Sequence, residues 1–483
     1  MPIQIYDSMQ RATMPLDTRE QGKVAMYVCG PTVYNYIHIG NARTFIWFDL
    51  IRRYLTYRGY DVNYVRNYTD VDDKIIERAK LEKLPPDAIT KKYTDAFEAD
   101  MAALGGDIPD MTVKATDHIK DMVTAIEGLV ANGSAYATDE GNVWFSIEGF
   151  EGYGKLSHRT IDDLRAGERV EPHAGKRHPL DFSLWKAAKE GEPSWDSPWG
   201  PGRPGWHIEC SVMSTKYLGP GFDIHGGGSD LIFPHHENEI AQAEGLDRDH
   251  EFARHWLHSG MVQMEAEKMS KSLGNVVLAR EVAERYGGEQ ARYWALTASY
   301  RAQAVFSEDT LYDATQGYER WRIFEDSAKH LLGDDFPADA WPATRDDDGL
   351  ATAPGYVVRF IEAMDDDFNS AGAFAVIHDL VREGNRILED AQRGDDEQRK
   401  ALIEIVGSFV ELIGVLGFRF PSTVGADSKV LGELLDYLLE LREAARAEKA
   451  FDRADEIRRR LGAIGVTIED TPAGARWRLE RPS

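Results

Sequence analysis

A short motif near the N-terminus combines residue types that suit the binding of a nucleotide. His38-Ile39-Gly40-Asn41 follows a short apolar segment and opens a stretch with helical spacing of apolar residues. A helix start offers free backbone N–H groups to a phosphate, and a glycine lets a flat ring approach the backbone. A histidine beside them can donate to a phosphoryl oxygen as charge develops. Alone the motif is weak, because a single histidine more often has a structural role.

A second motif, far downstream, carries mobile positive charge. It is Lys268-Met269-Ser270-Lys271-Ser272, called the lysine loop below, and it is followed by Leu273-Gly274-Asn275. Two lysines beside small hydroxyl residues suit a triphosphate from which pyrophosphate leaves, although an exposed charged loop would look similar. Together the two motifs are specific, and they resemble the two signature sequences of class I aminoacyl-tRNA synthetases.

Residue types that bind zinc stand in three separate segments. Cys29 and Cys210 are the only two cysteines, and His235 and Glu239 lie four residues apart, which places them on one helix face. The alternatives are two buried, inert thiols and a solvated acidic helix face. A disulfide is not expected in a cytoplasmic chain. Spacing alone does not join these residues into one site.

These segments are similar to cysteinyl-tRNA synthetases, and the similarity extends over nearly the whole chain. The segments that carry it are Tyr27-Val28-Cys29-Gly30, the block around Trp206, His225-Gly226-Gly227-Gly228-Ser229-Asp230, the lysine loop, Thr69-Asp70-Val71-Asp72-Asp73-Lys74 and Asp365-Asp366-Asp367-Phe368-Asn369. The resemblance implies an enzyme that activates L-cysteine with ATP to cysteinyl-adenylate and transfers it to the 3′-terminal ribose of tRNA(Cys).

The resemblance also implies a role for each candidate residue. It implies one zinc ion per chain, bound by Cys29, Cys210, His235 and Glu239. It implies catalysis by His38, Lys268 and Lys271, which also bind ATP together with Gly40, Asn41, Gly227, Asp230 and Mg²⁺. Finally, it implies a cysteine pocket lined by Thr69, Trp206 and His225.

Zinc would explain the choice of substrate. Zinc takes a thiolate far more readily than a hydroxyl, so it can reject serine without an editing domain. With four protein ligands present, the substrate sulfur is expected as a fifth ligand or in place of a weak ligand, for which Glu239 is the best candidate. One position departs from many relatives: Asn41 stands where they carry a second histidine, and an asparagine can donate a hydrogen bond but never carries charge.

The order of elements predicts an α/β fold. A strand at Val24–Cys29, a helix at Asn41–Tyr57 and a strand at Asp61–Tyr68 form a βαβ unit and indicate a parallel sheet. We expect a Rossmann-like parallel-sheet catalytic domain with an insertion, followed by a helical bundle and a small C-terminal α+β domain. The expected ranges are 1–116 and 205–307 for the two halves of the catalytic domain, 117–204 for the connective insertion, 308–420 for the bundle that contacts the tRNA stem, and 430–483 for the anticodon-binding domain.

Further elements are expected within these parts. They are a helix at Asp117–Asn132, a hairpin within Ala135–Phe145, a helix at Pro234–Glu244, a linker at Pro421–Lys429, a helical pair within Leu431–Leu461 and a final hairpin within Gly465–Leu479. Arg458-Arg459-Arg460 and Arg476-Trp477-Arg478 could contact RNA phosphates and bases. The first run could equally be a solvated helix face paired with Asp452, Asp455 and Glu456.

Composition sets limits on the partners. The chain has 483 residues and a formal net charge of −26, whereas nucleic-acid binding needs lysine and arginine. Two interpretations stay open: an ordinary acidic protein with local basic patches, or adaptation to high salt, because at 1 M salt the Debye length is about 3 Å. No apolar run reaches the length of a membrane span, and the first residues lack a signal pattern. We therefore expect a cytoplasmic protein, and a monomer because no self-association seam is visible.

Two other functions share these motifs. A cysteine ligase of mycothiol biosynthesis has both signatures and the zinc site but joins cysteine to an amino sugar, and it lacks the full C-terminal tRNA-binding end. This chain carries the segment from Leu431 to Leu479. A non-catalytic zinc- and tRNA-binding paralogue would be expected to have lost a lysine of the loop or a zinc ligand, and this chain keeps all of them.

Overall fold

The computed structural model is built around a parallel sheet. It describes residues 2–107, 109–161, 163, 175–264, 277–338, 345, 349, 353–391, 396–420, 426–471 and 474–479. The central sheet has five strands in the order β11-β10-β3-β4-β5, and every neighbouring pair is parallel. Its strands are β3 (Lys23–Val28), β4 (Asp61–Tyr68), β5 (Met111–Lys114), β10 (Phe222–Gly228) and β11 (Ala253–Ser259). The predicted Rossmann-like α/β fold is confirmed.

The sheet order creates a crevice at its middle. In chain order, β3, β4 and β5 lie next to one another in one direction across the sheet, and β10 and β11 then lie on the other side of β3. In an open α/β sheet, ligands bind beyond the carboxyl ends of the strands where the order reverses, which here is between β3 and β10. Cys29 directly follows β3, and the Gly226-Gly227-Gly228 run ends β10.

Helix α1 (Ile39–Tyr57) joins β3 to β4 and begins two residues earlier than expected. The side chain of His38 caps it by accepting from the N–H of Asn41, so Ile39 and Gly40 already belong to the helix. Most of its residues are buried, because the sheet covers one face and helices from the second half of the chain cover the other. Trp47 Nε1, for example, donates to the carbonyl oxygen of Ala295 at 3.0 Å.

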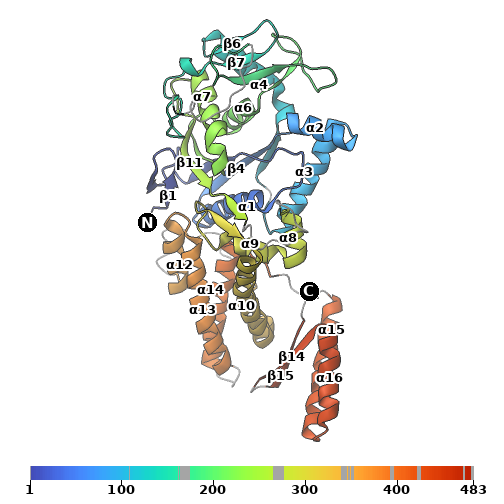
Figure 1. Cartoon of the computed structure of the whole chain (residues 1–483). Coiled ribbons are helices and arrows are strands. Elements are labelled where there is room, and N and C mark those ends of the chain that lie inside the picture. The colour runs from blue at the N-terminus through green and yellow to red at the C-terminus, as the bar shows by residue number, and fades with distance from the viewer. Residues whose placement is uncertain are drawn as a thin grey trace.

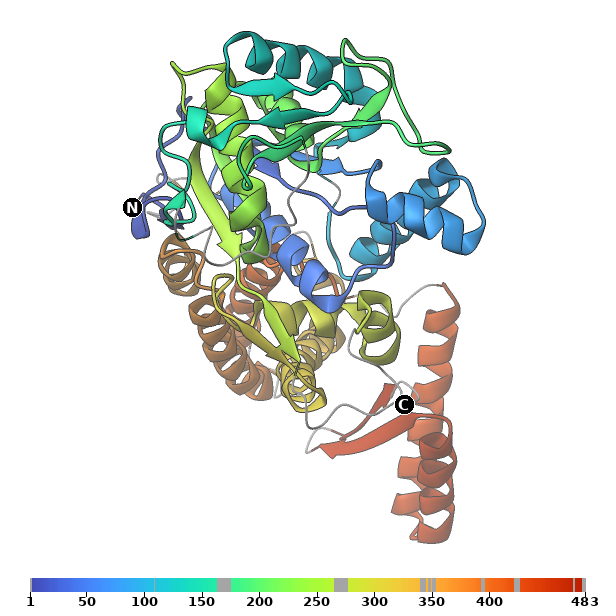
Figure 2. The ribbon, with the colours of Figure 1, turned by 45° about the horizontal axis from the view of Figure 1, so that its top comes forward.

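An antiparallel layer covers the upper end of the sheet domain (Figures 1 and 2). It contains α4 (Ile119–Ala131) and a four-stranded sheet, β6-β7-β8-β9, whose strands are β6 (Ala135–Ala137), β7 (Val143–Phe145), β8 (Phe182–Ala187) and β9 (Gly202–Pro204). β6 and β7 pair antiparallel, which confirms the expected hairpin. This layer shares one apolar core with Cys29 and Cys210, so the insertion helps to bury the metal-binding candidates.

Helices dominate the chain beyond the sheet, and they continue the core of α1. They are α8 (Ala279–Tyr286), α9 (Gly288–Leu296), α10 (Glu308–Leu332), α12 (Gly355–Asp365), α13 (Ser370–Ala391) and α14 (Asp396–Val415). Tyr54 of α1 donates to Asp365 of α12 at 2.5 Å, and Arg58 pairs with the same carboxylate. The bundle is therefore held directly against the helix that carries the first motif.

The C-terminal part has a small core of its own. Helices α15 (Ala426–Ala447) and α16 (Phe451–Ala463) pack with the antiparallel pair β14 (Val466–Thr471) and β15 (Gly474–Leu479) around Leu435, Leu439, Leu461, Val466 and Ile468. The expected helical pair and hairpin are confirmed. The linker expected at Pro421–Lys429 extended too far, because α15 already begins at Ala426. Acidic residues are favourable in a first helical turn as well as in a linker, so composition did not separate the linker from the helix.

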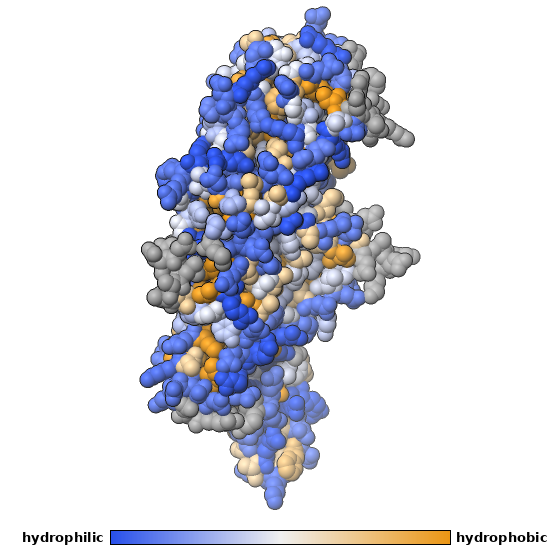
Figure 3. Space-filling view, turned by 90° about the vertical axis from the view of Figure 1, so that its left-hand side faces the viewer, coloured by the Kyte–Doolittle hydropathy of each residue, from blue (hydrophilic) through white to orange (hydrophobic). Residues whose placement is uncertain are grey.

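The surface agrees with the acidic composition. Figure 3 shows one face on which hydrophilic residues predominate and apolar residues form small separate areas. Within the described residues, no helix is both long enough and apolar enough to cross a membrane.

Candidate active site

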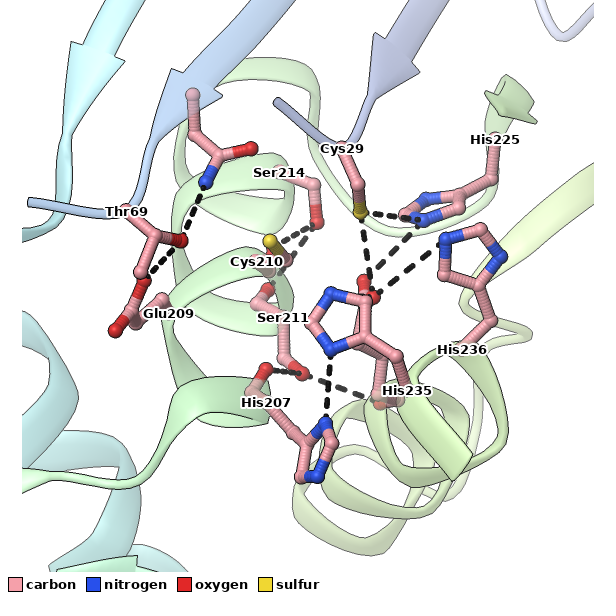
Figure 4. Close-up of polar contacts among 12 residues, drawn as sticks. Cys29, Thr69, His207, Glu209, Cys210, Ser211, Ser214, His225, His235 and His236 are labelled. Atoms are coloured by element: carbon pink, nitrogen blue, oxygen red, sulfur yellow. Dashed lines mark hydrogen bonds and ion pairs between the residues drawn. The ribbon is translucent and has the colours of Figure 1, made fainter. Parts of the chain in front are cut away.

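The four predicted metal ligands meet at the crevice between β3 and β10 (Figure 4). Cys29 directly follows β3, Cys210 lies in α6 (Trp206–Leu218), His235 lies in the helical turn η4 (Ile232–His236), and Glu239 lies in α7 (Glu237–Leu246). All four side chains are buried, and their ligand atoms lie within 4.8 Å of one another. The structure thus brings together residues that spacing alone could not join.

The segment that carries His235 differs from the expectation. A regular helix was expected from Pro234, but α7 begins at Glu237 and Pro234 lies in a π-helical turn in which Phe233 is extended, with φ −137° and ψ 133°. A residue before proline is disfavoured in the helical region, which explains the break. His235 and Glu239 still face each other, with 2.9 Å between Nε2 and Oε1.

The donor set fits zinc. Two thiols, an imidazole and a carboxylate are all ligands that zinc accepts in tetrahedral sites. Cys29 Sγ donates to Glu239 Oε1 at 3.4 Å, and the buried Glu239 Oε2 lies 3.2 Å from His225 Nε2. A buried carboxylate is costly unless a positive charge neutralises it. These residues could therefore hold a metal ion.

The pKa shifts favour the metal-binding forms of Glu239 and Cys210 and oppose that of Cys29. Burial opposes the charge of Glu239, but His225 and His235 hold its pKa well below the usual value. Burial raises the pKa of Cys29. Burial acts in the same direction on Cys210, but its hydrogen bonds with Cys29 and His235 lower its pKa overall. A charged carboxylate and one readily deprotonated thiol therefore face each other in the pocket.

Residues around the four candidates extend the pocket. Trp206 stacks on His235 with ring centroids 4.1 Å apart and keeps 36% of its surface exposed, so it closes the pocket toward solvent. His225 Nε2 lies 3.2 Å from Glu239 Oε2. Thr69 is buried at the end of β4, where its Oγ1 donates to Glu209 Oε2 at 2.8 Å. The three residues predicted to bind cysteine thus lie around the metal candidates.

Sequence reasoning missed several histidines of this region. His207 Nδ1 lies 2.8 Å from His235 Nδ1, and His236 Nδ1 lies 2.8 Å from His258 Nε2. His236 also belongs to a second group of possible ligands, with Cys29, His225 and Glu239. The adjacent His235-His236 pair was a visible signal, whereas His258 lies on another strand and no spacing points to it.

The first motif forms the start of α1. His38 Nδ1 accepts from the N–H of Asn41 at 3.2 Å, and Asn41 Oδ1 accepts from the N–H of His38 at 3.4 Å. In this capping box Asn41 has a structural role, and that role requires no charge. Burial lowers the pKa of His38 against the opposing effect of Asp230. The neutral ring, accepting at Nδ1, carries its proton on Nε2, where it can donate to a phosphate.

Lys268 and Lys271 lie outside the described residues, but both stems of their loop are described. The chain enters the loop after β12 (Val262–Met264) and returns at Val277. Val277 accepts from the N–H of Ile39 at 3.0 Å, and Ala279 donates to the carbonyl oxygen of Ile37 at 3.0 Å. The loop therefore returns beside the start of α1.

Arg43 also holds α1 in place. Its buried guanidinium donates to the carbonyl oxygens of Gly260 and Ser299, each at 2.8 Å. Burial lowers the pKa of Arg43 to about 10. These bonds tie α1 to the turn that precedes β12, a link that sequence reasoning missed.

Gly227 and Asp230 lie at the end of β10 and just beyond it. A Cβ at Gly227 would lie 2.9 Å from Leu231 Cδ1 and 3.0 Å from His236 Cε1, so a larger residue there would have to displace these side chains. Asp230 lies in the short turn η3 (Ser229–Leu231) and interacts electrostatically with His38. The nucleotide candidates thus surround the same end of the sheet, and their roles stay predictions.

Comparisons with known families agree with this arrangement. Residues 15–316 match the family model of the tRNA synthetases class I (C) catalytic domain, residues 359–420 match the DALR domain, and residues 430–478 match the cysteinyl-tRNA ligase anticodon binding domain.

Curated relatives match over the full length. The chain is 48% identical to a cysteine–tRNA ligase of Geobacter sulfurreducens, with 99% of this chain and 100% of that protein covered. It is 47% identical to a cysteine–tRNA ligase of Brevibacillus brevis, with the same coverage.

Solved structures share the fold. Methionyl-tRNA synthetase of Mycobacterium tuberculosis, in complex with methionyl-adenylate, has a TM-score of 0.59 at 17% identity and covers 82% of this chain and 90% of its own. A putative arginyl-tRNA synthetase of Campylobacter jejuni has a TM-score of 0.53 at 14% identity, with 83% and 94% covered. With its catalytic and anticodon-binding models both matched and its relatives aligned end to end, the chain belongs to the cysteinyl-tRNA ligase family of class I aminoacyl-tRNA synthetases.

Proposed function

We propose that this chain activates L-cysteine with ATP and transfers it from cysteinyl-adenylate to the 3′-terminal ribose of tRNA(Cys). The observation that carries the proposal is the buried group of Cys29, Cys210, His235 and Glu239 at the switch point of a Rossmann-like sheet. The full-length relatives named cysteine–tRNA ligase support the same activity.

We propose that this group holds one zinc ion. Bound there, zinc would bind the substrate thiolate in preference to the hydroxyl of serine. The residues themselves supply the remaining selectivity. Trp206 closes the pocket over His235, and Thr69, held by Glu209, presents a fixed hydroxyl oxygen.

For the activation step, we propose that the cysteine carboxylate attacks the α-phosphate of ATP at the start of α1. His38 donates from Nε2 to a phosphoryl oxygen, and the free N–H groups of the first helical turn add partial positive charge. Lys268 and Lys271 neutralise the departing pyrophosphate together with Mg²⁺. Gly40, Asn41, Gly227 and Asp230 complete the proposed nucleotide contacts. The returning stem of the lysine loop supports this, because the backbone of Leu278 is bridged to that of His38.

For the transfer step, we propose that the bundle within 308–420 contacts the tRNA stem and that the part within 430–483 reads the anticodon, in a monomeric enzyme. The match to an anticodon binding model over residues 430–478 supports the second role. Two arginines of the run Arg458–Arg460 are already paired, which weakens the run as an RNA-binding candidate. Arg460 Nε pairs with Glu456 at 2.6 Å, and Arg459 pairs with the same carboxylate.

Aminoacylation tests the proposal against the amino-sugar ligase. We expect cysteine to be attached to tRNA(Cys) and not to a glucosamine-containing acceptor, with each acceptor offered separately with radiolabelled cysteine and ATP. Product on the amino sugar alone would contradict the proposal. Adenylate formation without transfer to either acceptor would leave the tRNA-binding role of the C-terminal part unsupported.

A further inference from the structure

Two histidine pairs approach Glu239 from neighbouring positions. His235 directs Nε2 to Glu239 Oε1 at 2.9 Å while its Nδ1 contacts His207 Nδ1 at 2.8 Å. His236 directs Nε2 to the same oxygen at 3.9 Å while its Nδ1 contacts His258 Nε2 at 2.8 Å. Each ring is therefore held on its far side by a second imidazole. This is how proteins orient a metal-binding histidine.

The second pair continues to a hydroxyl. His258 Nδ1 lies 2.8 Å from Ser8 Oγ. Because this hydroxyl can accept a hydrogen bond, the pair can adopt the tautomer in which His236 donates from Nδ1 to His258 and turns the lone pair of its Nε2 toward Glu239. His236 is fully buried, and its Nε2 makes no hydrogen bond among the described residues. In that tautomer His236 Nε2 can bind a cation.

Further donor atoms complete a set around His236 Nε2. His225 Nε2 lies 3.5 Å from Cys29 Sγ and 3.2 Å from Glu239 Oε2. The ligand atoms of Cys29, His225, His236 and Glu239 lie within 4.8 Å of one another, and all four residues are buried. Figure 4 shows His225 and His236 on the side of Cys29 away from Cys210. One thiolate, two imidazoles and a carboxylate suit Zn²⁺ or Co²⁺ and not Mg²⁺, which prefers oxygen ligands.

We propose that the pocket contains a second divalent-metal position, formed by Cys29, His225, His236 and Glu239, that overlaps the first. It rests on the proposed function, in which this pocket binds a metal ion. Because Cys29 and Glu239 belong to both sets, one ion occupies the pocket at a time and exchanges Cys210 and His235 for His225 and His236. Ligand exchange on the Cys210 side therefore does not release the ion from the protein.

The experiment is a Co²⁺ titration of full-length protein stripped of metal, followed by absorption spectroscopy. The wild-type protein is expected to bind one Co²⁺ with the sulfur-to-metal band of two thiolates. His235→Ala is expected to keep one Co²⁺ at lower affinity, with a band of about half the intensity, since only Cys29 remains a thiolate ligand. Cys210→Ser removes the first set by an independent route and is expected to behave in the same way. His235→Ala/His236→Ala is expected to lose the ion.

Two matched variants separate the positions further. His258→Gln is expected to weaken Co²⁺ binding about 10–100-fold in the His235→Ala background and to leave the wild-type affinity unchanged. His207→Gln is expected to weaken Co²⁺ binding in the otherwise wild-type protein and to leave the affinity of the His235→Ala variant unchanged, because His207 supports His235 and not His236.

The second position would be ruled out if His235→Ala and Cys210→Ser, shown to be folded by circular dichroism, both bound no Co²⁺. It would also be ruled out if His235→Ala/His236→Ala bound Co²⁺ as tightly as His235→Ala. Failure of the wild-type protein itself to bind metal would instead contradict the proposed function, so the two failures are distinguishable.

Discussion

The backbone of His38 forms an antiparallel bridge with the backbone of Leu278. His38 caps the helix that carries the first motif, and Leu278 follows directly on the returning stem of the lysine loop. The two motifs are more than 200 residues apart in the sequence, yet the described return of the lysine loop is bridged directly to the start of the first motif.

Removing a lysine of the loop is expected to slow chemistry more than it weakens binding. Lys271→Ala should lower the rate of adenylate formation about 100-fold or more, because an electrostatic contact that strengthens in the transition state contributes about 3–4 kcal/mol. The dissociation constant of cysteine should change little. Single-turnover kinetics with ATP and cysteine measure the rate, and calorimetry measures the binding.

The matched control for this variant is Lys91→Ala, which removes an exposed lysine of α3 (Pro86–Ala103) that pairs with Asp95. It should leave both quantities unchanged. An unaltered rate in Lys271→Ala would remove this residue from the proposed catalytic group.

Removing the cysteine shared by both metal positions is expected to abolish metal binding. Cys29→Ser should lower the zinc content from about one per chain to near zero. It should also reduce cysteine-dependent ATP–pyrophosphate exchange by more than about 100-fold, since loss of a supporting residue alone costs about 10–100-fold in metal affinity. Elemental analysis of the purified protein measures the zinc.

Ser214→Ala is the control for Cys29→Ser, because the Ser214 hydroxyl is buried on α6 and, among the described residues, bonds only the carbonyl oxygens of Cys210 and Ser211. It should retain the metal. Full zinc content in Cys29→Ser would show that the ligands have been assigned wrongly.

Truncation after Phe420 is expected to separate activation from transfer. The removed part has its own core, formed by residues such as Leu435 and Leu461, so its loss should leave the rest folded. Exchange of pyrophosphate should persist, whereas aminoacylation of tRNA(Cys) should fall sharply. Undiminished aminoacylation would mean that this part has another task.

One buried carboxyl predicts a pH-dependent stability. Burial raises the pKa of Glu325 in α10 to about 7, despite its pairing with Lys329. The folded protein therefore retains this proton between its unfolded pKa of about 4.3 and pH 7. Stability from this group is present at low pH and is lost as the pH rises toward 7 and above.

Glu325→Gln should accordingly raise the melting temperature at pH 8 and have little effect at pH 5. The gain corresponds to at most about 4 kcal/mol, from about 1.4 kcal/mol for each pKa unit. Thermal melting at the two pH values measures it. A variant that is less stable at pH 8 than the parent would show that the ion pair with Lys329 outweighs the burial of charge.

Much of the fold follows from local patterns. The strand at Asp61–Tyr68 was predicted at its observed bounds, because valines and tyrosines, which favour strands, follow a glycine turn. The first helix was placed two residues late, because His38 was treated as a ligand for phosphate rather than as a cap. Periodicity does not reveal that one side chain can do both.

The metal pocket shows what a single sequence leaves open. Cys29, Cys210, His235 and Glu239 were identified by resemblance, since three separate segments must fold before their ligand atoms meet. His258 supports His236 from β11, and no spacing connects the two. Long-range contacts of this kind depend on sheet order, which local periodicity does not encode.

The most direct test of the account is cysteine-dependent ATP–pyrophosphate exchange on protein assayed for zinc, with serine as the competing amino acid and KCl varied. We predict exchange with cysteine and not with serine, at about one zinc per chain, at one or more of the KCl concentrations tested. Absence of exchange with cysteine at every salt concentration, in folded protein that contains zinc, would contradict it and would favour a non-catalytic zinc- and tRNA-binding protein.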